Sequence, residues 1–251
     1  MGELYVLDEL SRIAPVIAVQ GNDEAEEVKR ALPFQAVLSI AGTRIVVAHG
    51  HEHDFQKEMA LRKEDAWGPK LDRWFAQGKN ANATINIFGH IHIPMQLRRD
   101  DILIINPGAL ASGGALSRQT LKTVALLFIF AEQPPEVAFI DLRQPDRAFQ
   151  PVWDWDAGFS AAHKQTDESI LEPTLAAYWT ELEAQIRGVL FNHSFTDVSR
   201  MLKAVQWVTM PYWMEEHSFI TGAELMDAIE QVPDLPPTLI TDLRALLITH
   251  R

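Results

Sequence analysis

The chain has 251 residues, and 47% of them are hydrophobic, which is enough for a sizeable buried core; it contains no cysteine, which excludes disulfide bonds and thiolate metal sites. Its 34 acidic and 22 basic side chains give a formal charge of -12, which opposes nonspecific binding to nucleic acid or to an anionic membrane. The longest apolar run, residues 124–131, is far shorter than the roughly 18 residues of a membrane span, and no secretory signal opens the chain. We therefore expect no membrane span and a cytoplasmic protein.

The N-terminal part of the chain is predicted to alternate helices and strands. Apolar residues at helical spacing predict a helix over residues 4–13, and the apolar run Val16–Val19 predicts a buried strand. The strand leads into the turn residues Gly21-Asn22, and a short helix follows over residues 25–32. This strand therefore presents Asn22 at its carboxyl end.

Three further predicted strands deliver polar turns at their carboxyl ends, and a predicted helical region over residues 56–77 lies between the first and the second. In the predicted strand pair 36–40 and 44–48, the second strand leads into His49-Gly50-His51. The predicted strand 84–88 leads into Gly89-His90-Ile91-His92, and the predicted strand 102–105 leads into Asn106-Pro107-Gly108. Turns beyond the carboxyl ends of strands converge on the ligand site in open α/β folds, so these residues can meet in space. Because neutral imidazole is the commonest side-chain metal ligand, the pattern predicts a metal site.

The character of the chain changes after two more predicted strands, 124–130 and 137–140. We expect a first domain over residues 1–145 and a helical C-terminal extension over residues 146–251, in which Thr221 and Glu224 fit a capping box. The predicted helices of the extension span residues 172–189, 197–208, 223–229 and 238–248. Its aromatic side chains are expected to pack these helices rather than to line a cleft; they are Trp179, Trp207, Tyr212, Trp213 and Phe219.

Taken together and in this order, the four polar turns resemble the later motifs of the calcineurin-like metallophosphoesterases, and more narrowly of their small bacterial and archaeal phosphodiesterase branch. The resemblance covers roughly residues 1–142. It implies an α/β (α+β) fold, a β-sandwich flanked by helices, here lacking the first strand and followed by the helical extension. It also implies that Asn22, His49 and His90 bind one metal ion and that His92 binds a second. His51 would be either a substrate-phosphate contact or an exposed turn residue.

The resemblance also implies two motifs that do not precede residue 21 here, namely Asp-x-His and a Gly-Asp whose aspartate bridges the two metals. We interpret the chain as N-terminally truncated, with Met1 an internal methionine, and expect weak metal binding and little turnover from the chain as written. Glu3 follows a glycine, but it is terminal and its spacing to Asn22 is too short for the bridging role. No catalytic residue is assigned, because the motif around Asn22 does not identify a leaving-group acid.

The function that the resemblance implies is hydrolysis of a phosphodiester or a small phosphomonoester by a metal-bound hydroxide, with two divalent cations clamping the reacting oxygens. We predict Mn²⁺, while Fe, Zn²⁺ or Ni²⁺ also suit imidazole and carboxylate ligands. The alternative is a catalytically inactive binding or scaffold module, as the retromer subunit with this fold is. A missing strand would also expose a sheet edge, through which copies of the chain could associate.

Overall fold

The computed structural model describes residues 4–22, 24, 26–111, 114–214 and 217–248, and the chain forms two compact units. The first unit comprises Met1–Leu110 and Leu121–Thr166, and the second comprises Ala111–Thr120 and Asp167–Arg251. Within the described residues, no helix is long and apolar enough to cross a membrane. The predicted domain boundary at residue 145 and the predicted cytoplasmic location stay predictions.

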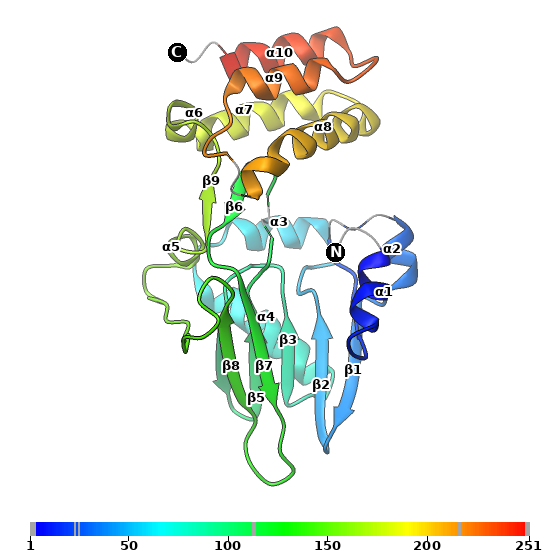
Figure 1. The fold of residues 1–251 in the computed structure, drawn as a ribbon, viewed down its shortest axis with the longest axis vertical. Helices are drawn as coiled ribbons and strands as arrows, with labels where there is room; N and C mark the ends of the chain where they lie inside the picture. Colours follow the sequence, from blue (N-terminus) through cyan, green and yellow to red (C-terminus); the bar gives the residue numbers. More distant parts are fainter. Residues whose placement is uncertain (1–3, 23, 25, 112–113, 215–216, 249–251) are drawn as a thin grey trace. The chain divides into compact units, whose positions relative to one another are not determined.

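The first unit is built on a five-stranded sheet with the strand order β1-β2-β3-β5-β4 (Figure 1). The strands β2, β3 and β5 run parallel, and β1 and β4 pair antiparallel with them at the two edges. Parallel strands that are covered on both faces need nearly continuous apolar sequence, and these three have it. The bounds are β1 (Gln35–Ile40), β2 (Thr43–Ala48), β3 (Ile85–Phe88), β4 (Met95–Arg99) and β5 (Ile102–Asn106). Association of copies through a sheet edge stays a prediction.

The predicted strand pair is confirmed as the hairpin of β1 and β2. Ile40 pairs with Thr43, so only Ala41 and Gly42 form the turn. Their φ angles are 49° and 82°, which is the left-handed backbone that a two-residue type I′ turn requires at both positions. The glycine takes this conformation without steric cost.

Helix α4 (Trp67–Asn80) covers one face of the sheet. Its buried residues recur at helical spacing, and Trp74 stacks on Phe88 of β3 with ring centroids 4.0 Å apart. The helix approaches β5 so closely that a Cβ at Gly78 would lie 3.0 Å from Ile102 Cγ2. This packing fixes the carboxyl end of β3, where His90 follows.

The hairpin of β7 (Thr123–Phe128) and β8 (Glu136–Asp141) covers the other face of the sheet (Figure 1). Phe139 from this hairpin is buried in one cluster with Ile45, Ile85 and other side chains of the sheet. The unit therefore has mixed α/β layering, with a β-sandwich flanked by helices, as predicted from the sequence.

Two predictions for the N-terminal half were wrong. Val16–Val19 is not a strand: Val16 and Ile17 are 36% and 55% exposed, and no strand among the described residues pairs with this segment. An apolar run becomes a strand only where a neighbour pairs its backbone.

The predicted helix over residues 56–77 is two helices, α3 (Phe55–Lys63) and α4, separated by three residues. The Asp54 side chain caps α3 by accepting from the N–H groups of Gln56 and Lys57. The two other N-terminal helices are α1 (Tyr5–Ser11) and α2 (Glu26–Ala31).

The second unit is mainly helical. Its helices are α6 (Pro173–Ala177), α7 (Trp179–Phe191), α8 (Phe195–Trp213), α9 (Gly222–Glu230) and α10 (Pro237–Ile248). Its strands are β6 (Ser117–Gln119) and β9 (Asp167–Ser169). The remaining helix, α5 (Phe159–His163), belongs to the first unit. The capping box is confirmed, since Thr221 Oγ1 accepts from Glu224 N–H and the Glu224 carboxylate accepts from Thr221 N–H.

The predicted packing role of the C-terminal aromatic residues holds for three of the five. Tyr212 is buried in the core of the second unit, and Trp179 and Trp213 pack against it. The prediction was wrong for Trp207 and Phe219, which are 72% and 51% exposed. Composition predicts that aromatic residues are buried, but it does not predict which helix face turns outward.

Candidate metal centre

The parallel strands β2 and β3 bring His49 and His90 to one edge of the sheet. Ala48 of β2 lies opposite Phe88 of β3, and both strands end there. His49 and His90 therefore leave neighbouring strands at the same level. The Gly89 N–H also donates to the His49 carbonyl at 3.0 Å, which joins the two turns.

Three donor atoms from Asn22, His49 and His90 face one another. Asn22 Oδ1 lies 2.8 Å from His49 Nε2 and 3.2 Å from His90 Nδ1, and the two ring nitrogens are 3.3 Å apart. The structure thus brings together three residues separated by up to 68 positions in the chain. They are the three that the sequence assigns to one metal ion.

His49 is held in its neutral form. Burial, followed by the neighbouring His90 and His51, lowers the pKa of His49 from 6.5 to about 3. A neutral imidazole keeps a lone pair that can bind a cation, whereas a protonated ring would repel one.

Glu58 on α3 is a site residue that the sequence analysis missed. Its Oε1 lies 2.6 Å from His90 Nε2, and the residue is only 7% exposed. Since an ionised carboxylate only accepts hydrogen bonds, Nε2 of His90 is the donor to Glu58, and Nδ1 is the ring nitrogen that faces Asn22 and His49. A carboxylate behind an imidazole is the usual outer support of a metal-binding histidine.

Three further hydrogen bonds stabilise the negative charge of the Glu58 carboxylate. Its oxygens accept from Arg62 Nε at 2.9 Å, from Glu52 N–H at 2.9 Å and from Arg73 Nη1 at 3.4 Å. Burial opposes ionisation of this carboxyl, but the hydrogen bonds from His90, the Glu52 backbone and Arg62 outweigh it and hold the pKa of Glu58 well below its usual range. The carboxylate is therefore charged throughout the physiological range.

The backbone at His90 is strained, which indicates that the turn is held in place by its surroundings. His90 has a φ of 70° and lies at the centre of a three-residue turn closed by the Ile91 N–H to the Gly89 carbonyl at 2.8 Å. This is the rare and strained form of γ-turn. The fully buried Asn106 supports it, since Asn106 Nδ2 donates to the same Gly89 carbonyl at 2.8 Å while its Oδ1 accepts from Gly108 N–H at 2.9 Å.

His92 lies two residues beyond His90, is half-buried and has a φ of 59°. The left-handed backbone at both His90 and His92 makes this segment a turn rather than a continuation of β3. His92 is close enough to His49 to contribute to the lowered pKa of His49. Glu3, the rejected candidate for a bridging carboxylate, lies outside the described residues.

His51 lies beside the three donor atoms rather than among them. Its ring centroid is 5.4 Å from that of His49 and 6.0 Å from that of His90. Its Nδ1 is buried and has no hydrogen-bond partner among the described residues, and burial lowers the pKa of His51. The next histidine, His53, is exposed and stacks on Phe34 with centroids 3.6 Å apart.

The three converging donors fit a divalent cation. Ligand atoms that bind one cation at 2.0–2.2 Å lie about 2.8–3.6 Å apart in tetrahedral or octahedral geometry, and the three observed separations fall in that range. In the described part of the chain, no group of three or more His, Cys, Asp or Glu side chains is arranged to hold a metal. The third donor here is the amide oxygen of Asn22.

The comparison with protein families agrees with this site. Residues 1–129, just over half of the chain, match the model of the calcineurin-like phosphoesterase superfamily domain. The chain belongs to this superfamily. The matched range contains all the turns that carry the candidate ligands, and the layering of the first unit is that of a metallophosphoesterase fold.

Individual relatives within the superfamily are distant. Phosphodiesterase YfcE of Escherichia coli (strain K12) is 28% identical over 136 residues, which cover 48% of this chain and 63% of YfcE. Probable metallophosphoesterase MJ0623 of Methanocaldococcus jannaschii is 32% identical over 106 residues, which cover 41% of this chain and 46% of MJ0623. The chain thus spans less than two thirds of either relative. Among solved structures, Vps29 of Chaetomium thermophilum matches with a TM-score of 0.42 and 16% identity over 59% of this chain and 70% of Vps29.

Proposed function

We propose that this protein is a metal-dependent phosphoesterase that hydrolyses a phosphodiester or a small phosphomonoester at the carboxyl edge of its five-stranded sheet. The observation that carries the proposal is the convergence of Asn22 Oδ1, His49 Nε2 and His90 Nδ1 within 3.3 Å of one another. Membership of the superfamily and the phosphodiesterase name of the relative YfcE support this reaction class.

In this proposal Asn22, His49 and His90 hold one divalent cation, and His92 contributes to a second. Mn²⁺ is the cation we propose, with Fe, Zn²⁺ and Ni²⁺ as the other metals that suit such ligands. Bound cations would supply Lewis-acid activation and neutralise the charge of the phosphate ester. For a chain of net charge -12, they would also provide the local positive charge that attracts such a substrate.

The side chains around the cation would have distinct tasks. Glu58 keeps Nδ1 of His90 directed at Asn22 by accepting a hydrogen bond from Nε2 of His90. His51 lies beside the donors with a lowered pKa, so as a neutral ring it would donate one hydrogen bond to a phosphate oxygen. Its role is therefore to position the substrate, next to the atoms that bind the metal.

The proposal is tested by hydrolysis of bis(4-nitrophenyl) phosphate, with metal content measured on the same samples. We expect a low turnover that requires Mn²⁺, stops on chelation and falls at least a hundredfold in His90→Ala. The matched control is His193→Ala in the second unit, which should behave as the unchanged protein. A turnover that is the same in His90→Ala and in the unchanged, folded protein would overturn the proposal.

The second unit favours another candidate function, that of a binding or scaffold module. Trp207 and Met210 of α8 are 72% and 42% exposed, and Met214, which caps the C-terminus of this helix, is 67% exposed; their spacing puts them on one side of the helix. An exposed apolar face of this kind typically contacts a partner. Metal binding without any turnover, in a folded protein, would favour this candidate over the enzyme.

A further inference from the structure

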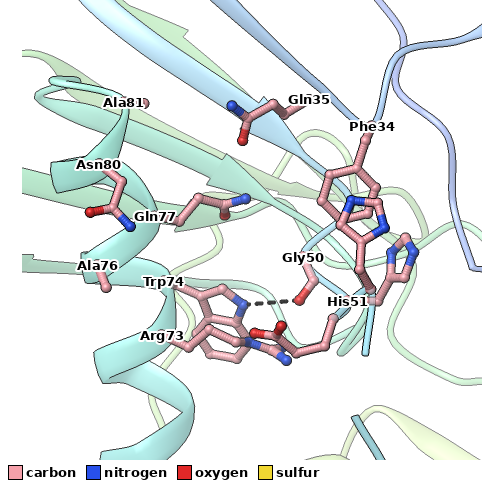
Figure 2. Close-up of a pocket in the computed structure, with 12 residues that line it drawn as sticks. Phe34, Gln35, Gly50, His51, Arg73, Trp74, Ala76, Gln77, Asn80 and Ala81 are labelled. Atoms are coloured by element: carbon pink, nitrogen blue, oxygen red, sulfur yellow. Dashed lines mark hydrogen bonds between the residues drawn. The ribbon is translucent and has the colours of Figure 1, made fainter. Parts of the chain in front are cut away.

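A pocket of about 320 Å³ adjoins the candidate metal centre within the first unit (Figure 2). Three elements line it: the start of β1, the turn that follows β2, and the C-terminal half of α4. The residues that define its chemistry are Phe34, Gln35, His51, Trp74, Gln77 and Asn80. A volume of this size suits a single small organic group, since it lies at the lower end of the range for ligand pockets.

The pocket shares residues with the metal centre. His51 lines the pocket, and its ring lies 5.4 Å from the ring of His49. Arg73 also lines the pocket and donates to Glu58, which in turn contacts His90. A ligand with one end at the three donor atoms can therefore extend past His51 into the pocket.

The lining is rich in neutral hydrogen-bonding groups, and its charged residues are Glu52 and Arg73. Three primary amides, those of Gln35, Gln77 and Asn80, line the pocket, and Figure 2 shows the amides of Gln35 and Gln77 directed toward the same space. Gln77 Oε1 accepts from Asn86 Nδ2 at 3.2 Å, which leaves the Gln77 amide nitrogen as a donor for a ligand. The positive charge of Arg73 is matched by Glu58 at 3.4 Å.

Phe34 and the nearly buried Trp74 supply aromatic rings to the lining. Phe34 is held in place by stacking on His53, and Trp74 is fixed by its indole N–H, which donates to the Gly50 carbonyl at 3.4 Å. Rings that are ordered before binding lose little entropy when a flat group packs on them. A purely apolar group would remove water from the amides without replacing its hydrogen bonds, so the lining favours a ring that carries polar edges.

We propose that this pocket binds the organic group of the phosphate ester, and that this group is an uncharged planar ring with amide-type N–H and C=O edges, as in a nucleobase. The position of the phosphate in this inference rests on the proposed function. The binding of the ring to the pocket does not. Each amide contributes a hydrogen bond to the ring edge, and Phe34 contacts its face.

Binding of thymidine to the metal-free chain tests the ring without any need for turnover. We expect saturable binding by nuclear magnetic resonance titration, weakened about threefold to tenfold in Gln35→Leu and in Asn80→Leu, because each loses one hydrogen bond. Both residues are exposed, so neither substitution disturbs the core. Gln133→Leu, an exposed glutamine in the loop after β7, is the matched control and should bind as the unchanged protein does.

Two results would overturn the pocket assignment: no binding of thymidine, or equal binding in the two pocket variants and the unchanged protein. Equal affinity for 2-phenylethanol would overturn the requirement for polar edges. A second arm compares thymidine 5′-(4-nitrophenyl) phosphate with bis(4-nitrophenyl) phosphate, and we expect kcat/KM to favour the thymidine ester. Thymidine binding without hydrolysis of either ester would overturn the proposed function while supporting the pocket.

Discussion

His90 Nε2 and Glu58 Oε1 lie 2.6 Å apart, and this contact fixes which nitrogen of His90 faces the other two donors. With the Glu58 carboxylate as acceptor, Nε2 of His90 is the donor, and Nδ1 is the nitrogen that faces Asn22 and His49. The contact also holds the ring orientation, since Glu58 is anchored by Arg62 and by the Glu52 N–H. Glu58 is thus a positioning residue for His90.

Replacing Glu58 should weaken metal binding although Glu58 is not itself one of the three donors. We expect Glu58→Gln to lower the Mn²⁺ affinity about tenfold and Glu58→Ala to lower it by up to about a hundredfold, because the amide still accepts from His90 but carries no charge. Competition with a chelating dye measures the affinity. The exposed Glu136 of β8 provides the control Glu136→Gln. An unchanged affinity in Glu58→Ala would show that His90 is not positioned in this way.

Metal addition should stabilise the folded protein by an amount that grows with the logarithm of the metal concentration above the dissociation constant. At a hundred times the dissociation constant, a ligand that binds only the folded state adds about 2.7 kcal/mol to the free energy of unfolding. We expect Mn²⁺ to raise the melting temperature of chelator-treated protein and expect no such rise in His49→Ala. Differential scanning fluorimetry over a Mn²⁺ series checks this. An equal rise in both proteins would place the bound metal away from His49.

Asn106 should matter for the shape of the site rather than for metal ligation. Asn106→Leu keeps the branched shape of the side chain, but it removes one of the two hydrogen bonds to the Gly89 carbonyl and leaves the Gly108 N–H without its partner, at about 1–3 kcal/mol. Chemical denaturation measures the loss of stability. The exposed Asn80 gives the comparison, and Asn80→Leu should change stability by less than about 0.5 kcal/mol. A similar small change for Asn106→Leu would mean that the turn after β3 is held by other contacts.

The capping box of α9 should make the stability of the second unit depend on pH. The hydrogen bond from the Thr221 N–H, followed by the one from its hydroxyl, lowers the pKa of Glu224 below its ordinary value of 4.5. A carboxyl with a lowered pKa in the folded state stabilises that state above its unfolded pKa, and the contribution is lost as the pH falls through the folded pKa. We expect Glu224→Gln to cost about 0.3–1 kcal/mol at pH 7 and progressively less as the pH falls from 4.5 through the folded pKa. Denaturation curves of both proteins across this range test the sign; a constant difference would contradict it.

The grouping of Asn22, His49 and His90 could be predicted from the resemblance of their turns to a known family, and the apolar runs before His49 and His90 also place these two together. Strand ends are predictable from such runs, and parallel packing then places the turns together. The same logic failed for Val16–Val19, where the apolar run is present but no described strand pairs with it. A strand is a property of two segments, so one segment alone cannot predict it.

Glu58 could not be predicted, because its role depends on how α3 folds back over the edge of the sheet. In the sequence it is one of 34 acidic residues, and its spacing to Arg62 suggests only a surface ion pair. The break between α3 and α4 did leave a signal, since Pro69 lies in the first turn of α4, where proline is favoured. The short strands β6 and β9 have three residues each, which is too few for any periodicity to show.

The position of Glu58 has a consequence for how the site can evolve. His49 and His90 directly follow strands of the sheet and Asn22 lies before α2, but the carboxylate behind His90 comes from a helix in the connection between β2 and β3. Connections tolerate insertions and substitutions more readily than strands do. Sequence drift in this one helix could therefore retune metal preference and affinity across descendants while Asn22, His49 and His90 stay unchanged.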